Sequence, residues 1–390
     1  MHTDKQNRHF FLTIIRYISY SCISIFLLLI GLRVTYGQTI RRTDPVLKVM
    51  DRPDADTVEI CILGDMMMHK AQIENAHKCG QRYDFTSYLS HIRDKVSRAD
   101  IAIANMEFTL AGEPYEGYPT FSAPDCYAEY LADCGIDVFL AANNHIFDKG
   151  SEGAGRTIEI YRNLGRSHGI KYCGLAADIQ DRTVTYPLTV NVKGLDIAMV
   201  NCTYGTNIGA DRQWPKVNYM SNRDGLEEAL MRCNGSDFTI VLPHWGNEYE
   251  LRHSEKQKET AQWLIDNGAD IIVGTHPHVV QDIGTIDGVT VVYSIGNAIS
   301  NMSAANTQIG LMATIRLVRD RKGKTKVLPM EFTYLWCSRP GGYCSSYTII
   351  PVKEFIGTRD IWQGSWEYDK MVSTWERVSA ATGIRDNSTK

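Results

Sequence analysis

Two histidines, His276 and His278, lie on either side of Pro277, directly after the short apolar run 271–274. The apolar run is typical of a buried strand, and proline fixes its own φ, so both imidazoles are expected to be held near one point. Imidazole is the commonest metal-ligating side chain. The segment therefore predicts a metal site where a strand ends.

Four other stretches repeat this arrangement, in which an apolar run ends in side chains that can bind a metal. They provide Asp65; Asn105 and Glu107; Asn144 and His145; and His244. Mixed carboxylate, amide and imidazole donors suit Mn, Fe or Zn better than Ca or Mg. The donors are too many for one tetrahedral ion, so we expect two divalent transition metals, the arrangement that recurs in phosphate-ester hydrolysis.

The elements that must position these residues alternate between strands and helices. Apolar runs predict strands, and a capping box formed by Ser254 and Gln257 predicts a helix that runs to Gly268. The expected strands are 57–63, 99–104, 136–142, 170–174, 182–191, 195–203, 237–242, 271–273 and 289–295, with a hairpin over 309–334 and further helices near 155–167 and 366–381. This alternation indicates an α/β fold, in which ligands bind at the carboxyl ends of strands.

The composition is that of an ordinary globular protein. The chain has 390 residues, 44% of them apolar and 22% charged, and a formal charge of −4. These values exclude wholesale disorder and give no reason to expect a nucleic-acid partner. Of ten cysteines, Cys337 and Cys344 flank a short turn and are candidates for a disulfide.

The N-terminal 37 residues resemble an export signal. Basic residues precede a mostly apolar run over 18–32, and Gly37 follows as an acceptable cleavage position. An uncleaved membrane anchor is the alternative. Either way, we expect the body of the protein to lie in the periplasm, outside the cell, or anchored to the membrane.

The motifs, in their order along the chain, resemble the CapA family of poly-γ-glutamate capsule biosynthesis. They are Gly64-Asp65, Asn-x-Glu at 105–107, Asn-Asn-His-x-x-Asp at 143–148, His-Trp-Gly at 244–246, and Gly-x-His-Pro-His at 274–278, followed by Ser-Ile-Gly-Asn at 294–297. The family's domain belongs to the calcineurin-like metallophosphoesterase superfamily. The resemblance covers about residues 57–301 and implies a four-layer αββα sandwich of the metallo-dependent phosphatase type.

The N-terminal pattern and the resemblance together predict a division of the chain into four parts. Residues 1–37 are the signal peptide or anchor, 38–56 a linker, 57–335 the CapA-like domain and 336–390 a C-terminal extension.

The resemblance also implies roles for the residues of the motifs. Asp65 and His278 would bind the first metal; Asn144, His244 and His276 would bind the second. Glu107 stands where the superfamily has a bridging aspartate. His145 would protonate the leaving oxygen, with Asp148 orienting its ring.

Two positions depart from the superfamily pattern, and the first is Glu107, which is longer than the aspartate it replaces. Met67 occupies the place of a histidine, and His69 is interpreted as a surface-loop residue rather than its substitute.

Five further residues are candidates for substrate contact. They are Asn105, Asn143, Trp245, Ser294 and Asn297. A turn or packing role fits Asn143, Trp245, Ser294 and Asn297 as well.

The resulting hypothesis is an exported, metal-dependent hydrolase-like protein that acts on a polyanionic envelope polymer or a phosphoester. Membrane-bound polymer synthesis or export proteins would be its partners. One alternative is a non-enzymatic scaffold for polymer export or anchoring, which the replacement at Met67 favours. A second is a metal-dependent γ-glutamyl peptidase or transferase, because a metal-activated water can also attack an amide.

Overall fold

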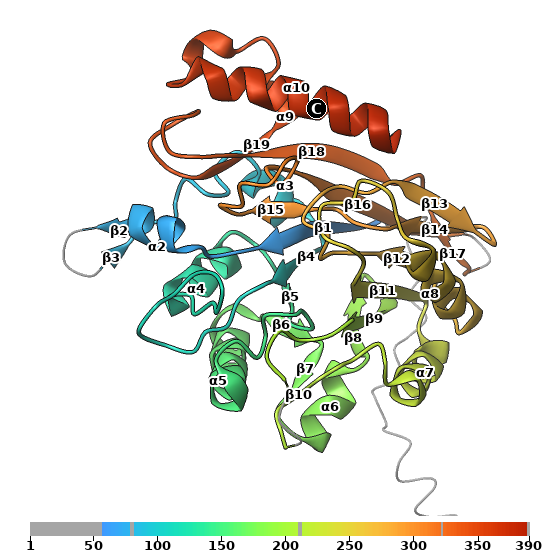
Figure 1. Cartoon of the computed structure of the whole chain (residues 1–390). Coiled ribbons are helices and arrows are strands. Elements are labelled where there is room, and N and C mark those ends of the chain that lie inside the picture. Colours follow the sequence, from blue (N-terminus) through green and yellow to red (C-terminus); the bar gives the residue numbers. More distant parts are fainter. Residues whose placement is uncertain (1–56, 79–81, 210–212, 321–322, 388–390) are drawn as a thin grey trace, which may run out of the picture. The chain divides into compact units, whose positions relative to one another are not determined.

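Two β-sheets pack face to face in the computed structural model, which describes residues 57–390 without 79–81, 210–212, 321–322 and 388–390 (Figure 1). The strands of the larger, nine-stranded sheet are β1 (Val58–Met66), β4 (Ile101–Met106), β5 (Val138–Leu140), β6 (Lys171–Cys173), β15 (Asn297–Ile299), β16 (Ile309–Arg319), β17 (Thr325–Val327), β18 (Glu331–Ser338) and β19 (Thr348–Pro351). Those of the six-stranded sheet are β8 (Leu188–Val192), β9 (Leu195–Thr203), β11 (Phe238–His244), β12 (Ile271–Val273), β13 (Ile283–Ile286) and β14 (Val289–Val292). Two small two-stranded sheets pair β2 (His77–Lys78) with β3 (Arg82–Tyr83), and β7 (Leu175–Ala176) with β10 (Lys216–Val217).

The strands that carry the predicted ligands run parallel within each sheet. In the larger sheet the order is β19-β18-β16-β1-β4-β5-β6, and β1, β4, β5 and β6 are parallel neighbours. In the smaller sheet the order is β13-β14-β12-β11-β9-β8, and β9, β11 and β12 are parallel. Parallel neighbours bring their carboxyl ends to the same edge, so the ligand-bearing ends gather in each sheet.

Strand residues alternate between two cores, as the two-residue period of a strand requires. In β1, Ile60 and Ile62 face the core between the sheets, whereas Cys61 and Leu63 face a core shared with helices. In β11, Ile240 likewise faces the inter-sheet core and Val241 a helix-covered core. The outer helices complete a four-layer αββα sandwich, so this prediction is confirmed.

The helices are amphipathic segments that cover the outer faces of the sheets. Their bounds are α2 (Lys70–Ala76), α3 (Arg93–Arg98), α4 (Asp125–Asp133), α5 (Gly150–His168), α6 (Ile179–Thr185), α7 (Arg223–Arg232), α8 (Glu255–Asp266), α9 (Val352–Phe355) and α10 (Ser365–Thr382). Helices α3, α4 and α5 pack on the larger sheet, and α7 and α8 on the smaller. The capping box of Ser254 and Gln257 is present at the start of α8, as predicted.

The strand predicted over 182–191 is wrong in its first half. Residues 179–185 form α6, and β8 begins only at Leu188. Asp178 caps this helix, because its side chain accepts a hydrogen bond from the backbone of Asp181. The β-branched residues of 183–185 favour a strand, but the Asp178 cap and the burial of Asp181 and Thr185 stabilise a short helix instead.

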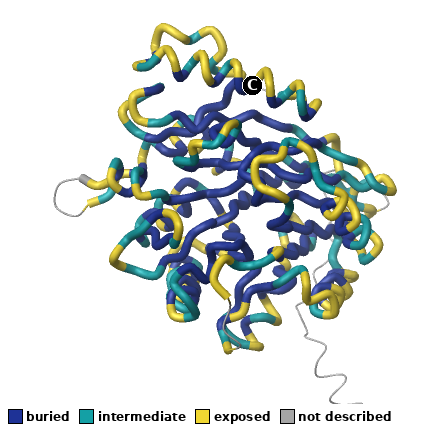
Figure 2. Tube along the Cα trace, in the orientation of Figure 1, coloured by how far each residue is buried: buried dark blue, intermediate teal, exposed yellow. Residues whose placement is uncertain are grey.

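The C-terminal segment is built into the same unit as the rest of the fold. β18 and β19 extend the larger sheet beyond β16, and Met371 and Val378 of α10 pack in the same core as Tyr334. Figure 2 shows the buried side of α10 turned toward the sheet and its outer side exposed. The boundary expected at residue 335 falls inside β18.

Residues 1–56, which carry the predicted export segment and linker, lie outside the described residues. Among the described residues, no helix has the length and apolar character needed to cross a membrane. The disulfide considered for Cys337 and Cys344 is not formed: both thiols are free, and each donates to a backbone oxygen, of Ser300 and Ser346 respectively.

Candidate metal centre

The predicted ligands meet where strands from both sheets end. Asp65 is the second-last residue of β1 and pairs in register with Asn105 near the end of β4. Glu107 follows β4 directly, and His244 is the last residue of β11. Because all of these side chains are buried, the strand ends enclose a polar centre inside the sandwich.

Glu107 lies at the middle of this centre. Its side chain is fully buried, and neither carboxylate oxygen has a hydrogen-bond partner. Three imidazole Nε2 atoms approach its Oε1: those of His278 at 3.7 Å, His244 at 3.8 Å and His145 at 4.0 Å. These distances are too long for hydrogen bonds, but two donors that each lie about 2.1 Å from one ion are separated by up to about 4 Å.

Second contacts turn two of these imidazoles toward the centre. Nδ1 of His278 lies 3.0 Å from Oδ1 of Asn297, and Nδ1 of His244 lies 3.0 Å from Oγ1 of Thr275. In the tautomer with its proton on Nδ1, each ring would donate to this oxygen and turn the lone pair of Nε2 toward Glu107. Metal-ligating histidines are commonly oriented by such a second contact.

The donor set fits divalent metals. Two groups of three side chains have donor atoms within 4.8 Å of one another: Glu107, His276 and His278 form one, and Asp65, Glu107 and His244 the other. Glu107 belongs to both, as a bridging ligand must. In the first group His276 and His278 lie together, whereas the resemblance assigns them to different metal ions. Both histidines lie near Glu107, so the same side chains would bind the metals in either assignment.

Burial and neighbouring charges shift the pKa values of the groups at this centre in different directions. Burial, followed by the charge of Asp65, raises the pKa of Glu107 well above its usual range. Burial also lowers the pKa of His244 far below its usual range and that of His276 to about 3, with the neighbouring histidines adding to the effect. His278 differs, because its contact with Asp65 outweighs burial and raises its pKa. The neutral imidazoles of His244 and His276 have a free lone pair for a metal, whereas Glu107 and His278 would each release a proton on binding one.

His145 and Asp148 form a buried pair at the edge of the centre. Nδ1 of His145 lies 2.6 Å from Oδ2 of Asp148, and the same oxygen accepts a hydrogen bond from the backbone of Phe121. The Phe121 ring meets the imidazole edge-on, with 4.7 Å between centroids. Asp148 and Phe121 therefore fix the ring so that its Nε2 points toward Glu107.

The residues considered for substrate contact are held by the protein itself. Asn105 donates to Asp65, and Asn143 donates to the backbone of Met106 and accepts from that of His145. Ser294 donates to the backbone of Val279 and accepts from that of Gly296. Their side chains are buried, so turn and support roles describe Asn143 and Ser294, and Asn105 supports Asp65.

Trp245 packs in the core beneath the smaller sheet. Its indole is 2% exposed and donates to the backbone oxygen of Tyr293 at 2.8 Å. The substrate contact predicted for it is therefore wrong, and the packing alternative holds. Asn297 is also buried, and its amide bonds His278 and the backbone of Thr307, so it supports the His278 ligand instead of facing a substrate.

The interpretation of His69 as a surface-loop residue is wrong. His69 caps α2, and its Nδ1 lies 3.1 Å from Oε1 of Gln72 and 3.2 Å from the backbone nitrogen of Asn301. Burial, with smaller contributions from the nearby His278 and His145, lowers its pKa to about 4. Met67, by contrast, is a core residue.

The backbone around the two histidines adopts an unusual conformation. His276 has φ 99° and His278 has φ 58°, both in the left-handed region that side chains other than glycine rarely occupy. Gly274 precedes them because a Cβ there would lie 2.2 Å from the oxygen of Tyr293 and 2.3 Å from Nε1 of Trp245. The loop thus passes too close to its neighbours for any side chain at 274.

Four residues near the centre escaped the sequence analysis: Tyr204, Asn207, Glu248 and Tyr249. The amide of Asn207 lies 3.4 Å from the His145 ring. Tyr204 and Tyr249 contact the rings of His276 and His278. The sequence marks them only by their position: Tyr204 comes directly after β9, and Glu248 and Tyr249 come within five residues of His244, which begins the His-Trp-Gly motif.

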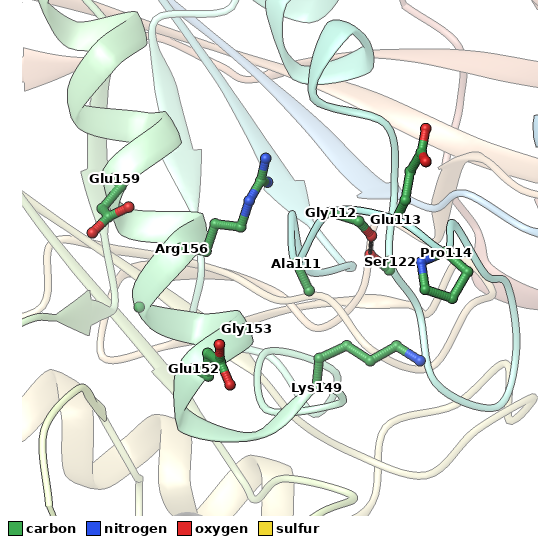
Figure 3. A pocket seen from close by; sticks show the side chains of 11 residues that line it. Ala111, Gly112, Glu113, Pro114, Ser122, Lys149, Glu152, Gly153, Arg156 and Glu159 are labelled. Atoms are coloured by element: carbon green, nitrogen blue, oxygen red, sulfur yellow. Dashed lines mark hydrogen bonds between the residues drawn. The ribbon is translucent and has the colours of Figure 1, made fainter. Parts of the chain in front are cut away.

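A separate hollow of about 640 Å³ lies between α5 and the segment 111–114. Charged side chains from and just before α5 surround it, including Lys149, Glu152, Arg156 and Glu159 (Figure 3). Arg156 is held by Asp125 through two hydrogen bonds of 2.7 Å. None of the predicted site residues lines this hollow.

Known proteins resemble the chain over most of its described length. A family model described as bacterial capsule synthesis protein PGA_cap matches residues 59–302. The capsule biosynthesis protein CapA of Bacillus anthracis is 26% identical over 322 residues, which cover 79% of this chain and 75% of that protein. The PGA biosynthesis protein CapA of Bacillus subtilis (strain 168) is 27% identical over 203 residues, which cover 52% of each protein.

Among solved structures, that of NAD nucleotidase from Haemophilus influenzae aligns with 83% of this chain and 67% of its own, with a TM-score of 0.43 and 13% identity. The matched family segment contains every predicted ligand.

Proposed function

The chain belongs to the bacterial capsule synthesis protein PGA_cap family, and from this premise we propose that it is an exported hydrolase with a dinuclear metal centre. Its substrate would be a polymer of the cell envelope or a phosphoester. The centre would take two divalent transition metals, Mn, Fe or Zn.

One observation supports this proposal most directly. The carboxylate of Glu107 is buried without a hydrogen-bond partner, and three imidazole nitrogens lie 3.7–4.0 Å from it. A buried carboxylate without partners is strongly unfavourable unless a cation meets it. Metal ions at this position would satisfy the carboxylate and the imidazoles together.

The residues available to hold the ions are Asp65, Glu107, Asn144, His244, His276 and His278. The chemistry that such a pair supplies when bound is an acidified water and positive charge opposite a developing oxyanion. Asn144 would contribute its Oδ1, which lies 2.8 Å from Nε2 of His244. Asn105 would hold Asp65 in place through its hydrogen bond of 2.7 Å.

His145 would deliver a proton to the leaving group. The hydrogen bond from its Nδ1 to Asp148 fixes the ring and leaves Nε2 as the atom that faces the centre. A protonated Nε2 in this position can act as the general acid, while Asp148 stabilises the charged imidazole.

The N-terminal segment and the family support a location in the cell envelope. Because relatives are named for capsule biosynthesis, the envelope is the compartment in which the proposed substrate occurs. Membrane-bound proteins of polymer synthesis or export would then be the partners.

Replacing His145 by alanine tests the proposal. We expect turnover to fall by about 10²–10⁴-fold, the usual contribution of a general acid. The assay would compare phosphomonoester, phosphodiester and γ-glutamyl substrates with added Mn²⁺, and metal content would be measured in parallel. His168→Ala, which removes a histidine at the exposed end of α5, is the matched control.

The outcome also decides between an enzyme and a scaffold. Activity that is present in the parent and lost in His145→Ala, with metal retained, supports the hydrolase. Full metal occupancy without turnover of any of these substrates would favour the scaffold for polymer export or anchoring.

Asn297→Ala tests the support of the metal centre. Because Asn297 orients His278 through a 3.0 Å contact with Nδ1, its loss should weaken metal affinity by roughly 10–100-fold. Titration with Mn²⁺, followed by calorimetry, measures this change. Asn191→Ala on β8, where the side chain is exposed and bonds Asp196, should leave the affinity unchanged. Equal affinities in both variants would contradict the role of Asn297.

A further inference from the structure

The loop that follows β15 connects the metal centre to the C-terminal part of the chain. Residues 300–308, here called the 300–308 loop, are turn and irregular structure and lead from β15 into β16. The matched family segment ends at residue 302, so most of this loop and all of the chain after it lie beyond that segment. Contacts between the loop and the C-terminal part are thus additions to the matched segment.

The inner side of the loop is tied to the centre through Asn297. Oδ1 of Asn297 faces Nδ1 of His278, whereas its Nδ2 donates to Oγ of Ser300 at 3.1 Å and to the backbone oxygen of Thr307 at 3.0 Å. Ser300 and Thr307 lie at the two ends of the loop. Because the oxygen and nitrogen of one amide group move together, the loop that holds Nδ2 also holds the oxygen that faces His278.

The outer side of the loop is held by α10. Lys370 donates to Oε1 of Gln308, and Nε2 of Gln308 donates to Oε1 of Glu367 at 3.1 Å. Arg377, two turns further along the helix, donates to Oδ1 of Asn306 at 2.8 Å. Three side chains of the C-terminal helix therefore bind the loop directly.

A buried network holds Gln308 and Glu367 in one arrangement. Gln308 is 4% exposed and Glu367 is fully buried. Glu367 also accepts hydrogen bonds from Oγ of Ser338 at 2.5 Å and from the backbone nitrogen of Arg339 at 3.0 Å. Gln308 bonds the backbone of Cys337 in both directions. Such a network resists rearrangement, because breaking one bond leaves a buried polar group without its partner.

We propose that α10 positions a ligand of the metal centre. Lys370 and Glu367 hold Gln308, the 300–308 loop holds Asn297, and Asn297 holds the ring of His278. Gln308 and Lys370 are positioning residues, since they act on the centre through Asn297. This inference rests on the proposed function and gives the same site a support that lies outside the matched family segment.

Lys370→Met tests the inference without disturbing the core, because Lys370 is exposed. Binding of Mn²⁺ to the full chain is measured by calorimetry, and the free energy of unfolding of the metal-free protein by chemical denaturation. We expect Mn²⁺ affinity to fall about threefold in Lys370→Met and about tenfold in Gln308→Leu, which removes the buried link. Lys370→Arg keeps a donor for Gln308 and should restore the affinity. Lys256→Met, at an exposed position of α8, is the matched control and should leave it unchanged.

A double-mutant cycle with Asn297→Ala identifies the route. If the effect passes through Asn297, Gln308→Leu should change Mn²⁺ affinity by less than about twofold once residue 297 is alanine. If Gln308→Leu does not fold, Lys370→Met takes its place in the cycle.

A merely structural role of α10 predicts a different result, in which the free energy of unfolding falls and Mn²⁺ affinity stays the same. That result overturns the inference, and so does an undiminished loss of affinity in the double variant. Both leave the proposed function intact. A parent protein that binds no Mn²⁺ would contradict the proposed function itself, so the two failures can be told apart.

Discussion

Replacing Glu107 by glutamine is expected to abolish the stabilisation that divalent metals give to this protein. A metal that binds the folded state at a thousandfold excess over its Kd stabilises it by about 4 kcal/mol. Glu107 belongs to both donor groups of the centre, so its loss affects every ion bound there. Thermal unfolding with and without Mn²⁺ measures the effect, and metal content should fall in step.

The metal-free variant is expected to change in the opposite direction. Because burial raises the pKa of Glu107, ionising this carboxyl at neutral pH destabilises the metal-free fold, and glutamine cannot ionise. Metal-free Glu107→Gln should therefore melt at a higher temperature than the parent at pH 7. The difference should shrink as the pH falls and vanish below about 4.3, where the carboxyl is protonated in the folded and unfolded states alike.

Glu129→Gln, an exposed position on α4, provides the control for both measurements. It should keep the metal response and leave the metal-free Tm unchanged. A Glu107→Gln protein that still gains stability from Mn²⁺ would show that the ions do not bind at this carboxylate.

Gly64→Ala is expected to destabilise the protein by about 3 to 5 kcal/mol. A Cβ at residue 64 would lie 1.8 Å from the backbone oxygen of Gly296. This oxygen also accepts the hydrogen bond from the nitrogen of Asp65, so neither chain segment can move without shifting a predicted ligand. Chemical denaturation measures the loss, and metal affinity should fall with it.

A second glycine separates this steric effect from the general effect of adding a methyl group. Gly155 lies within α5, and a Cβ there would meet nothing within 4 Å. Gly155→Ala should stabilise the protein by about 0.5–1 kcal/mol through helix propensity. If Gly64→Ala were tolerated as well as Gly155→Ala, the close approach of β1 to Gly296 would not constrain the fold.

The sequence predicts the parts of the centre that local patterns determine. An apolar run that ends in a polar motif can be recognised from a few neighbouring residues. The runs before Asp65, Glu107, His244 and His276 are indeed strands, and they meet at the centre. The layer order follows from strand–helix alternation together with the family resemblance.

Residues whose positions depend on distant contacts could not be read in this way. His69 is half-buried because Asn301, far along the chain, contacts its ring. Trp245 lies in a motif, but the oxygen of Tyr293 turns it into the core. Tyr204 and Tyr249 approach the centre from separate loops, so nothing in their local sequence marks them. The helix over 179–185 depends on one capping contact of Asp178 against a β-favouring composition.

The left-handed backbone of His276 and His278 has a consequence for how the centre acquires its ions. Each such conformation costs about 1–3 kcal/mol, and it persists only where the surrounding fold enforces it. Here the loop begins at Gly274, packed closely against Tyr293 and Trp245, and protein contacts from Asn297 hold the His278 ring. The donors are thus preorganised, and capture of an ion does not have to order a loop. A rigid cage of this kind discriminates between ions by their radius and preferred geometry more than by their charge.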